Sequence, residues 1–262
     1  MHSLPNSIPV MPICVALFVS FMHQHGYAGS TIATYLSPIS YVHKIQSLPD
    51  PIAHFLVQKA LIGVRNLTRV SDIRLPITLP LLDRMCQCLP IVCGSPYNRC
   101  LYKAMFLLAF FGFLRVGEMC CTNGPTHNIL SIGNIVILPI EGISITFTHY
   151  KHSKGKRHII KVSSRGSINC PVKALQSYIY LRGQQPGPLF ATASQLPVSR
   201  NAFTKILRDC INFLGMDSTF YKSHSFRIGA ATYAAQCGMS DDRIRYMGRW
   251  ASQAFIRYIR LG

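Results

Sequence analysis

The chain has 262 residues, enough for one large domain or two modest ones, and a hydrophobic content of 49% provides for a buried core. It carries 27 Lys and Arg against 9 Asp and Glu, a formal net charge of +18, and this surplus favours a polyanionic partner, nucleic acid before membrane. No Asp or Glu stands between Glu141 and Asp209, a span with eleven Lys or Arg, so the charge indicates a phosphate-facing surface rather than a solvated face of mixed sign.

Cysteine spacing and apolar runs argue against a zinc-binding, disulfide-rich or membrane-spanning protein. The ten cysteines form no Cys-x-x-Cys pair, so we expect neither a zinc site nor a disulfide framework, but reduced and mostly buried thiols in a cytosolic or nuclear protein. The most apolar early run, Val10 to Met22, is short for a bilayer span and lacks the basic start of a signal peptide. It predicts a core helix.

Residues 1–75 predict a small helical domain. A first helix is followed by a second that starts at Ser30 or Thr31, and Pro38 should kink or split it. Asp50-Pro51 pairs a capping residue with a proline at the first helical position, which predicts the start of a third helix there. Val70 to Pro76 is then expected to be a linker.

Residues 76–262 predict a second, mixed domain. Thr78 and Pro80 open a helix, and the nearly continuous apolar stretch 98–113 predicts a helix at the domain centre. The period then changes, and alternating β-branched residues predict three strands, at 135–138, 143–148 and 158–162. Further helices are expected from Pro171 and after Ser199. The expected fold class is therefore α+β and mostly helical, with a three-stranded antiparallel sheet in the second domain.

The apolar central helix ends in a candidate site. Gly112-Phe113-Leu114-Arg115-Val116-Gly117-Glu118 contains an arginine and a glutamate three residues apart. Taken alone, Arg115 and Glu118 could form an ordinary helical ion pair. Between the last two predicted strands, Tyr150 to Arg157 predicts a basic hairpin tip, and a charged loop of this kind is usually just solvated.

The densest group of candidate residues runs from His224 to Tyr258. His224 and Arg227 are three residues apart and share one face of a predicted helix. Small residues follow, which allow close packing, and Gly238 and Ser240 predict the end of this helix and the cap of the next. Two helices are then expected to bring Trp250 and Tyr258 back towards His224 and Arg227.

His-x-x-Arg, then His or Trp, then Tyr is the C-terminal half of the signature of the tyrosine recombinases, or phage integrase family, and here it reads His224, Arg227, Trp250, Tyr258. The chain resembles that family. It looks most similar to the animal branch found in DIRS-like and Crypton-like mobile elements, whose version also reads HSFRIGAAT…GRW…YIR. Each residue alone could be a helix cap, a surface cation or a core aromatic, but four types in this order over 35 residues favour the family.

The resemblance implies a site-specific recombinase or integrase that needs no metal or cofactor. Tyr258 would attack a DNA phosphodiester and form a 3′-phosphotyrosine. Arg115 and Arg227 would hold the non-bridging phosphate oxygens. His224 would be the acid–base residue, since the indole of Trp250 donates a hydrogen bond but cannot accept a proton. Trp250 stands eight residues before Tyr258, one fewer than in well-known phage and bacterial members.

Further positions map onto the family pattern. Gly-x-x-Arg-x-x-Glu carries the family's first catalytic arginine, which puts Arg115 in that role and makes Glu118 the supporting acid. The family's hairpin lysine, which would protonate the leaving 5′-oxygen, best fits Lys154, with Lys151 and Lys156 as alternatives. Residues expected to contact DNA are Lys151, Lys156, Arg157 and Arg249.

The resemblance also implies an organisation and a partner. Residues 1–75 would be a core-binding domain that looks short at its N-terminus. Residues 76–262 would be the catalytic domain, and the sequence ends four residues after Tyr258, without the further helix that many members dock on a neighbour. We expect double-stranded DNA as partner, a homo-oligomer on DNA (a tetramer in the family), no membrane, and a nuclear location. The alternatives are a type IB topoisomerase, which shares the chemistry, and a non-catalytic DNA-binding relic of a mobile element.

Overall fold

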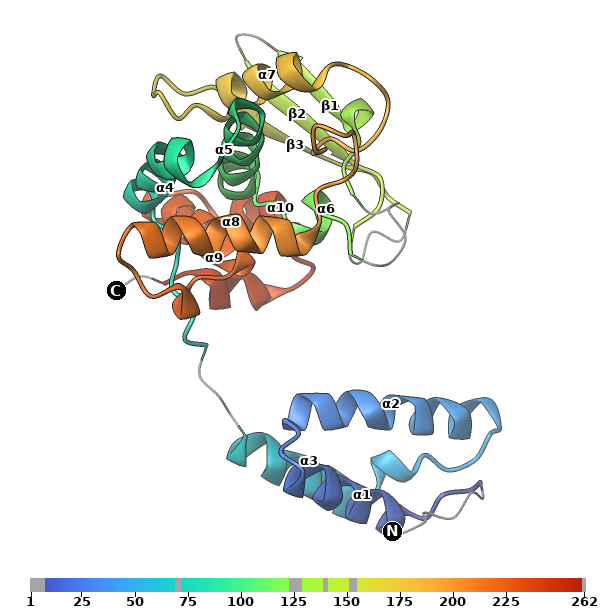
Figure 1. Cartoon of the computed structure of the whole chain (residues 1–262). Helices are drawn as coiled ribbons and strands as arrows, with labels where there is room; N and C mark the ends of the chain where they lie inside the picture. Colours follow the sequence, from blue (N-terminus) through green and yellow to red (C-terminus); the bar gives the residue numbers. More distant parts are fainter. Residues whose placement is uncertain (1–7, 69–71, 123–128, 139–140, 151–154, 261–262) are drawn as a thin grey trace. The chain divides into compact units, whose positions relative to one another are not determined.

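The computed structural model describes residues 8–68, 72–122, 129–138, 141–150 and 155–260. The chain divides into two compact units, Met1–Asp72 and Ile73–Gly262. The sequence predicted a boundary between residues 75 and 76. The two units are described separately below, and Figure 1 labels their helices and strands.

The first unit is helical. Its core holds eight side chains, Val15, Val19, Met22, Ile32, Leu36, Val57, Leu61 and Val64. Its elements are α1 (Pro12–Gln24), α2 (Gly29–Ile45), the 3₁₀ turn η1 (Pro51–Ala53) and α3 (Phe55–Leu67).

Two local predictions in this unit need correction. Pro38 lies inside α2 and does not split it, since α2 is one helix from Gly29 to Ile45. The alternative, that Pro38 kinks the helix, stays a prediction. Asp50 caps the short turn η1 by accepting a hydrogen bond from the Ile52 N–H, so it does not start the third helix. The ring of His54 accepts from the Leu56 N–H and begins α3 instead.

In the second unit, several helices begin where the sequence places a hydroxyl cap. Thr78, Ser95 and Ser199 each accept a hydrogen bond from a backbone N–H in the first turn of the helix that follows. The helices are α4 (Leu79–Val92), α5 (Pro96–Phe111), α6 (Val116–Met119), α7 (Pro171–Arg182), α8 (Arg200–Phe213), α9 (Ser223–Gln236) and α10 (Asp241–Gly248). The 3₁₀ turns are η3 (Ile132–Asn134), η4 (Ser218–Phe220) and η5 (Gln253–Tyr258).

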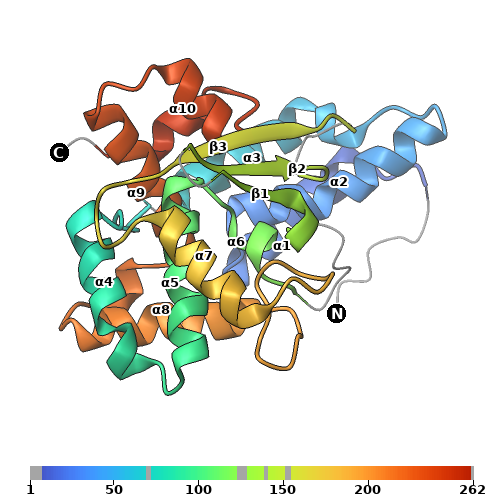
Figure 2. The same ribbon diagram turned by 90° about the horizontal axis from the view of Figure 1, so that it is seen from above.

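The core of the second unit is built around α5. Every residue of α5 from Ala104 to Phe110 is buried, and α4, α7 and α9 pack against it. Figure 2 shows α7 beside α5 on the side of the unit that carries the sheet. A helix that is apolar all round must lie at the centre of a domain, as the sequence predicted.

The sheet has three antiparallel strands in the order β1-β2-β3: β1 (Ile135–Leu138), β2 (Gly142–Phe147) and β3 (His158–Ser163). Ile145 of β2 lies opposite Ile135 of β1 and Ile160 of β3. Ile143, Ile145 and Phe147 alternate with more exposed residues and face the core. The predicted fold class, α+β and mostly helical with a three-stranded antiparallel sheet, is confirmed.

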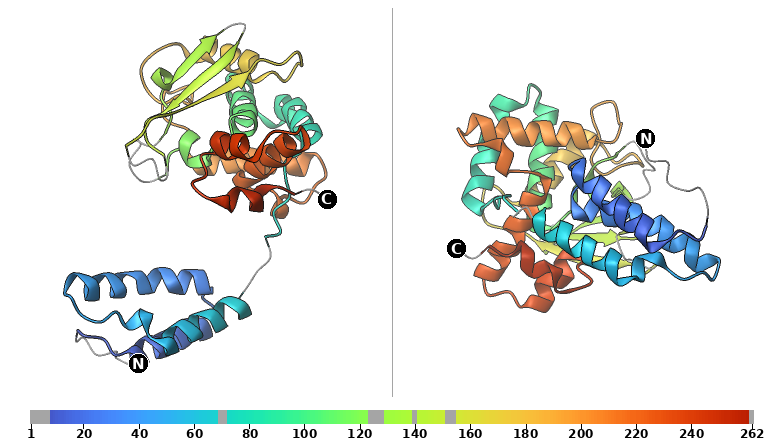
Figure 3. Two further views of the ribbon diagram at one scale, coloured as in Figure 1. Left: turned by 180° about the vertical axis from the view of Figure 1, so that it is seen from behind. Right: turned by 90° about the horizontal axis from the view of Figure 1, so that it is seen from below.

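The small residues of α9 allow a very close backbone contact. A Cβ atom built on Gly229 would lie 1.8 Å from the carbonyl oxygen of Ile77, so only glycine fits there. The extended segment that carries Ile77 is tied to α9 by a hydrogen bond from the Ile77 N–H to the Ser225 carbonyl. Figure 3 shows this segment beside the C-terminal part of the chain.

The C-terminal segment differs from the expected pair of helices. Helix α10 ends at Gly248, and Tyr258 stands at the end of the 3₁₀ turn η5. The Thr232 hydroxyl of α9 donates to the Tyr258 carbonyl oxygen at 3.3 Å and accepts from the Arg260 N–H at 3.0 Å. One side chain therefore holds the backbone on both sides of Tyr258. No helix in the described parts of either unit has the length and apolar character needed to cross a bilayer.

Candidate active site

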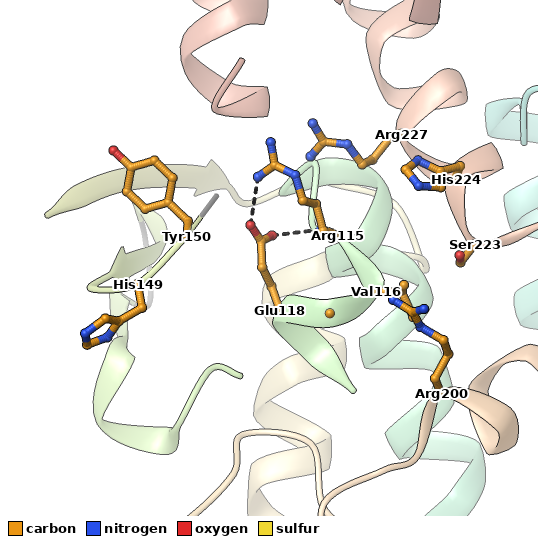
Figure 4. Close-up of a pocket in the computed structure, with 10 residues that line it drawn as sticks. Arg115, Val116, Glu118, His149, Tyr150, Arg200, Ser223, His224 and Arg227 are labelled. Carbon is orange, nitrogen blue, oxygen red and sulfur yellow. Dashed lines mark hydrogen bonds and ion pairs between the residues drawn. The ribbon is translucent and has the colours of Figure 1, made fainter. Parts of the chain in front are cut away.

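A pocket of about 400 Å³ in the second unit collects charged and aromatic side chains from distant parts of the chain. Figure 4 shows Tyr150 and His149 on one side, His224 and Ser223 on the other, and Arg115 with Glu118 between them. The lining residues are Arg115, Val116, Gly117, Glu118, His149, Tyr150, Arg200, Ser223, His224 and Arg227. Four of the predicted site residues, Arg115, Glu118, His224 and Arg227, therefore share one pocket.

Arg115 and Glu118 enter the pocket from the turn after α5. The backbone reverses at Phe113, whose φ is 51°, and Arg115 stands at the N-cap of α6. Glu118 accepts from the Arg115 backbone N–H at 2.7 Å and from its guanidinium at 3.0 Å. Burial would raise the pKa of Glu118, but the charges of Arg249 and Arg115 lower it overall. The pair is thus part of a larger charge cluster and more than a helical ion pair.

Arg227 is 1% exposed and lies at the back of the pocket. Its guanidinium donates to the carbonyl oxygens of Phe113 and Gly248. Each terminal nitrogen carries two hydrogens, so these bonds leave further donors. Among the described residues, its buried Nε has no hydrogen-bond partner. Burial, followed by the charges of Arg115 and Arg249, lowers the pKa of Arg227, but a guanidinium remains charged in proteins.

His224 stands on α9 one turn before Arg227. Desolvation of its ring and the charges of Arg74, Arg227, Arg115 and Arg200 lower its pKa below 6.5. The shift favours the neutral imidazole, which has a free ring nitrogen that can accept a proton, while the surrounding positive charge makes it a weaker base.

Tyr258 and Trp250 lie beside this pocket. The Tyr258 ring centroid is 5.7 Å from the guanidinium carbon of Arg227 and 6.2 Å from the His224 ring. The Trp250 and Tyr258 rings are 5.0 Å apart, and both are half-buried. The structure therefore brings the predicted set of His224, Arg227, Trp250 and Tyr258 together around one guanidinium.

The predicted basic hairpin is only partly described. Lys151 and Lys154, including the preferred hairpin lysine, lie outside the described residues. Lys156 and Arg157 are exposed just before β3. Which lysine could serve the pocket stays a prediction.

Arg249 was expected to contact DNA, but its side chain is buried inside the second unit. Its side chain is 0% exposed, and Arg249 does not line the pocket that Arg115 and Arg227 line, but borders the neighbouring one. Its Nη2 lies 2.7 Å from Oε2 of Glu118, and further bonds run to backbone carbonyls. A buried arginine needs a carboxylate and carbonyl acceptors of this kind, and Glu118 supplies the carboxylate from 131 positions earlier in the chain.

Sequence reasoning missed several residues of the pocket. Arg200 is the first residue of α8, and its exposed side chain lines the pocket opposite Tyr150. Tyr150 lines this pocket and a second one of about 420 Å³ next to it, which is bordered by His158, Tyr246 and Trp250. The clue for Arg200 was its place in the acid-free span, but nothing distinguished it from the ten other cations there.

In the described part of the chain, no three His, Cys, Asp or Glu side chains group in a way that could hold a metal ion. Glu118 faces arginines rather than a second carboxylate. The three arginines that line the pocket, Arg115, Arg200 and Arg227, are donors suited to an anion.

The chain is similar in sequence and fold to known recombinases. No family model matches the chain. Its sequence is similar to an integrase/recombinase XerD homolog of Selenomonas ruminantium, with 26% identity over 170 residues that cover 61% of this chain and 47% of that protein. The match thus spans about half the length of this curated relative.

Solved structures share the fold over nearly the whole chain. The Tn1549 transposon integrase in complex with circular intermediate DNA has a TM-score of 0.64 at 15% identity, covering 97% of this chain and 82% of that chain. A lambda integrase dimer bound to a COC′ core site gives 0.61 at 16% identity, covering 99% and 67%. The XerA recombinase gives 0.55 at 19%, covering 98% and 81%. These likenesses show the fold, and with the sequence match they support the tyrosine recombinase/integrase family.

Proposed function

We propose that this chain is a site-specific DNA recombinase or integrase that cuts and rejoins DNA through a 3′-phosphotyrosine. The observation that carries the proposal is the meeting of Arg115, Arg227 and His224 in one pocket with the Tyr258 ring beside Arg227. These side chains come from the turn after α5, from α9 and from η5. The proposal also has the support of the fold and of the sequence similarity to a XerD homolog.

The chemistry follows from the types of side chain. The Tyr258 oxygen attacks the phosphorus, the bond from phosphorus to the 5′-oxygen breaks, and the phosphodiester energy is kept in the phosphotyrosine for rejoining. His224, whose lowered pKa favours the neutral imidazole, accepts the phenol proton. Arg115 and Arg227 stabilise the charge that develops on the non-bridging oxygens, and losing one such donor costs roughly 3–4 kcal/mol.

The leaving 5′-oxygen needs a proton from a separate acid. A lysine of the hairpin before β3 is our choice, with Lys154 preferred and Lys151 or Lys156 as alternatives. The choice is supported by Tyr150, the last described residue before this segment, which lines the pocket. Substitution of the lysine should block strand release more than DNA binding.

Finer parts of the proposal rest on the sequence. The order HSFRIGAAT…GRW…YIR supports an origin in an animal mobile element of the DIRS-like or Crypton-like branch. We propose that the first unit is a DNA-binding core-binding domain, that the protein acts as a homo-oligomer on DNA, and that its location is nuclear. The Tn1549 integrase structures contain DNA, and one lambda integrase structure is a dimer on a core site, which supports DNA binding and oligomers for proteins of this fold.

The test is covalent capture of DNA. A pool of nicked duplexes with randomised flanks is incubated with protein, because the nick lets the short strand diffuse away and traps the 3′-adduct. We expect a protein–DNA adduct that resists denaturation and disappears in Tyr258→Phe, while DNA binding persists. Tyr246→Phe is the control, since its hydroxyl donates to the Ile159 carbonyl and the ring lines the neighbouring pocket.

Two outcomes contradict the proposal. Adduct formation that survives Tyr258→Phe would exclude Tyr258 as nucleophile. DNA binding without any adduct from the randomised pool would favour the second candidate, a non-catalytic DNA-binding relic. The complete set of Arg115, His224, Arg227 and Tyr258 around one pocket favours the enzyme over the relic.

A further inference from the structure

Arg249 connects four parts of the second unit. Its guanidinium bonds to both carboxylate oxygens of Glu118, at 2.7 and 3.3 Å, and to the carbonyl oxygen of Phe113 at 2.9 Å. Its Nη1 donates to the Met247 carbonyl at 2.6 Å, within its own turn. The guanidinium carbon also lies 4.1 Å from the centroid of the Phe147 ring on β2.

The turn that carries Arg249 also holds Arg115 and Arg227. The carbonyl oxygen of Gly248 accepts from Arg227 at 2.8 Å and from Arg115 at 3.3 Å. The carbonyl oxygen of Arg249 itself accepts from Arg115 at 3.0 Å. Both phosphate-facing arginines are therefore oriented by backbone atoms whose position depends on this turn.

The Arg249 backbone is in the left-handed region, with φ 54° and ψ 45°. A non-glycine residue in this region is uncommon and needs its surroundings to hold it there. The bonds from its side chain to Met247, Phe113 and Glu118 supply that restraint. They also leave the carbonyls of Gly248 and Arg249 facing the other two guanidinium groups.

We propose that Arg249 is a positioning residue, which never touches DNA and holds the Gly248–Arg249 turn so that its carbonyl oxygens orient Arg115 and Arg227. This inference rests on the proposed function for its effect on catalysis, but its structural part stands alone. Glu118 then has two tasks, because it bonds to Arg115 directly and fixes Arg249 as well. Under this proposal the reaction depends on Arg249 through the two arginines that its turn orients, although its own side chain is buried.

Arg249→Gly is the sharpest deletion, because glycine adopts the left-handed conformation without steric cost. It removes the guanidinium and leaves a hole of the same shape beside Glu118. We expect the rate of adduct formation to fall about 100-fold, the order that a shift of about 1 Å produces at an active site. The dissociation constant for duplex DNA, measured at one salt concentration, should change less than about threefold. Phosphate contacts set most of the affinity for DNA, and in this proposal Arg249 makes no such contact, so its removal takes none away.

A matched control and a rescue separate positioning from general damage. Arg182 is also buried, at 3% exposed, and bonds to the carbonyls of Gly183, Gln185 and Pro188 at the end of α7, outside the pocket residues. Arg182→Gly should lower stability without lowering the adduct rate of the folded protein. Millimolar guanidinium chloride should restore the Arg249→Gly rate at least about tenfold, and potassium chloride at the same concentration should not, because only guanidinium can make the planar, forked bonds to Glu118.

A readout without catalysis tests the structural part. In protein labelled with ¹⁵N-arginine, the side-chain signals of Arg115 and Arg227 should move in Arg249→Gly and in the milder Arg249→Lys, and stay unchanged in Arg182→Gly. If the Arg115 and Arg227 signals do not move, the inference about Arg249 is wrong, whether or not the wild type forms an adduct. If the signals move but the wild type forms no adduct, the proposed function is rejected and the inference about Arg249 stands. A DNA affinity that falls as steeply as the adduct rate would also overturn it, because Arg249 would then contact the DNA.

Discussion

The guanidinium of Arg227 lies over the indole of Trp250 in a cation–π contact, with its central carbon 4.3 Å from the ring centroid. The same indole packs edge-on against Phe113, whose carbonyl oxygen accepts from Arg227. Trp250 therefore contributes a face as well as an N–H group. The indole face helps to orient the guanidinium of Arg227, which the carbonyl oxygens of Phe113 and Gly248 already restrain.

This relationship predicts how substitutions of Trp250 rank. Trp250→Phe keeps an aromatic face over Arg227 and should retain most adduct formation, whereas Trp250→Ala should lose about 1–2 kcal/mol of this contact and much of the rate. Trp250→His keeps a donor but a smaller face, and should fall between them. Adduct yield and thermal unfolding of the three variants check the order. A Phe variant as poor as Ala would mean that the indole N–H matters more than the face.

His224 predicts a specific dependence on pH. Its pKa in the folded protein is below 6.5, so the unfolded chain takes up a proton first as the pH falls. The contribution to the free energy of unfolding is fully present above pH 6.5 and is lost as the pH falls through the folded pKa. His224→Gln should remove part of this acid destabilisation, as followed by chemical denaturation between pH 7 and pH 5.

The same shift can be read directly by NMR. The ring signals of His224 should titrate below pH 6.5, and Arg200→Ala should move the midpoint upward, because one of the charges that lowers the pKa is removed. A midpoint that is insensitive to Arg200 would show that the two side chains do not share the pocket in solution.

Arg200 predicts a phosphate contact that the motif does not include. It lines the pocket with Arg115 and Arg227, so Arg200→Ala should weaken DNA binding and reduce the slope of log K on log salt by about 0.9, the value for one phosphate. Arg208→Ala, an exposed arginine two turns later on α8, is the control. Equal effects of the two variants on adduct formation would contradict a specific place for Arg200 in the pocket.

Gly229 predicts a steric limit on α9, the helix that carries His224 and Arg227. Because a Cβ atom would lie 1.8 Å from the Ile77 carbonyl oxygen, Gly229→Ala should destabilise the second unit by at least about 1–3 kcal/mol. Gly63→Ala in α3, where nothing lies within 4 Å of the added atom, should instead stabilise its unit by about 0.5–1 kcal/mol. Thermal unfolding monitored by circular dichroism measures both changes.

Local signals account for what the sequence could predict. Thr78 and Ser199 occur directly before helical patterns and cap them, and the three strands are visible because β-branched residues alternate. His224 and Arg227 share a face because they are one helical turn apart. Each of these predictions depends on neighbours in the sequence.

Predictions failed where distant residues decide the outcome, or where two capping residues close in the sequence compete. Arg249 looks like a surface cation in a short turn, and its partner Glu118 is 131 positions away. Asp50-Pro51 has the composition of a helix start, but the chain makes a short 3₁₀ turn first and His54 takes over the cap. Arg200 of α8 and Tyr150, which follows β2, meet at the pocket only in the folded unit, where α8 packs against α4 and β3 packs against α7.

The arginines around Glu118 have a consequence for the handling of this protein. Arg115 and Arg249 share that carboxylate, and Arg227 lies against the same turn, so the folded state concentrates like charge that a multivalent anion would relieve. Any anion that binds here and not to the unfolded chain raises the melting temperature by mass action. The melting temperature of the protein should therefore be lower in chloride than in sulfate of equal ionic strength. Nucleic acid carried over from expression should raise the melting temperature in the same way.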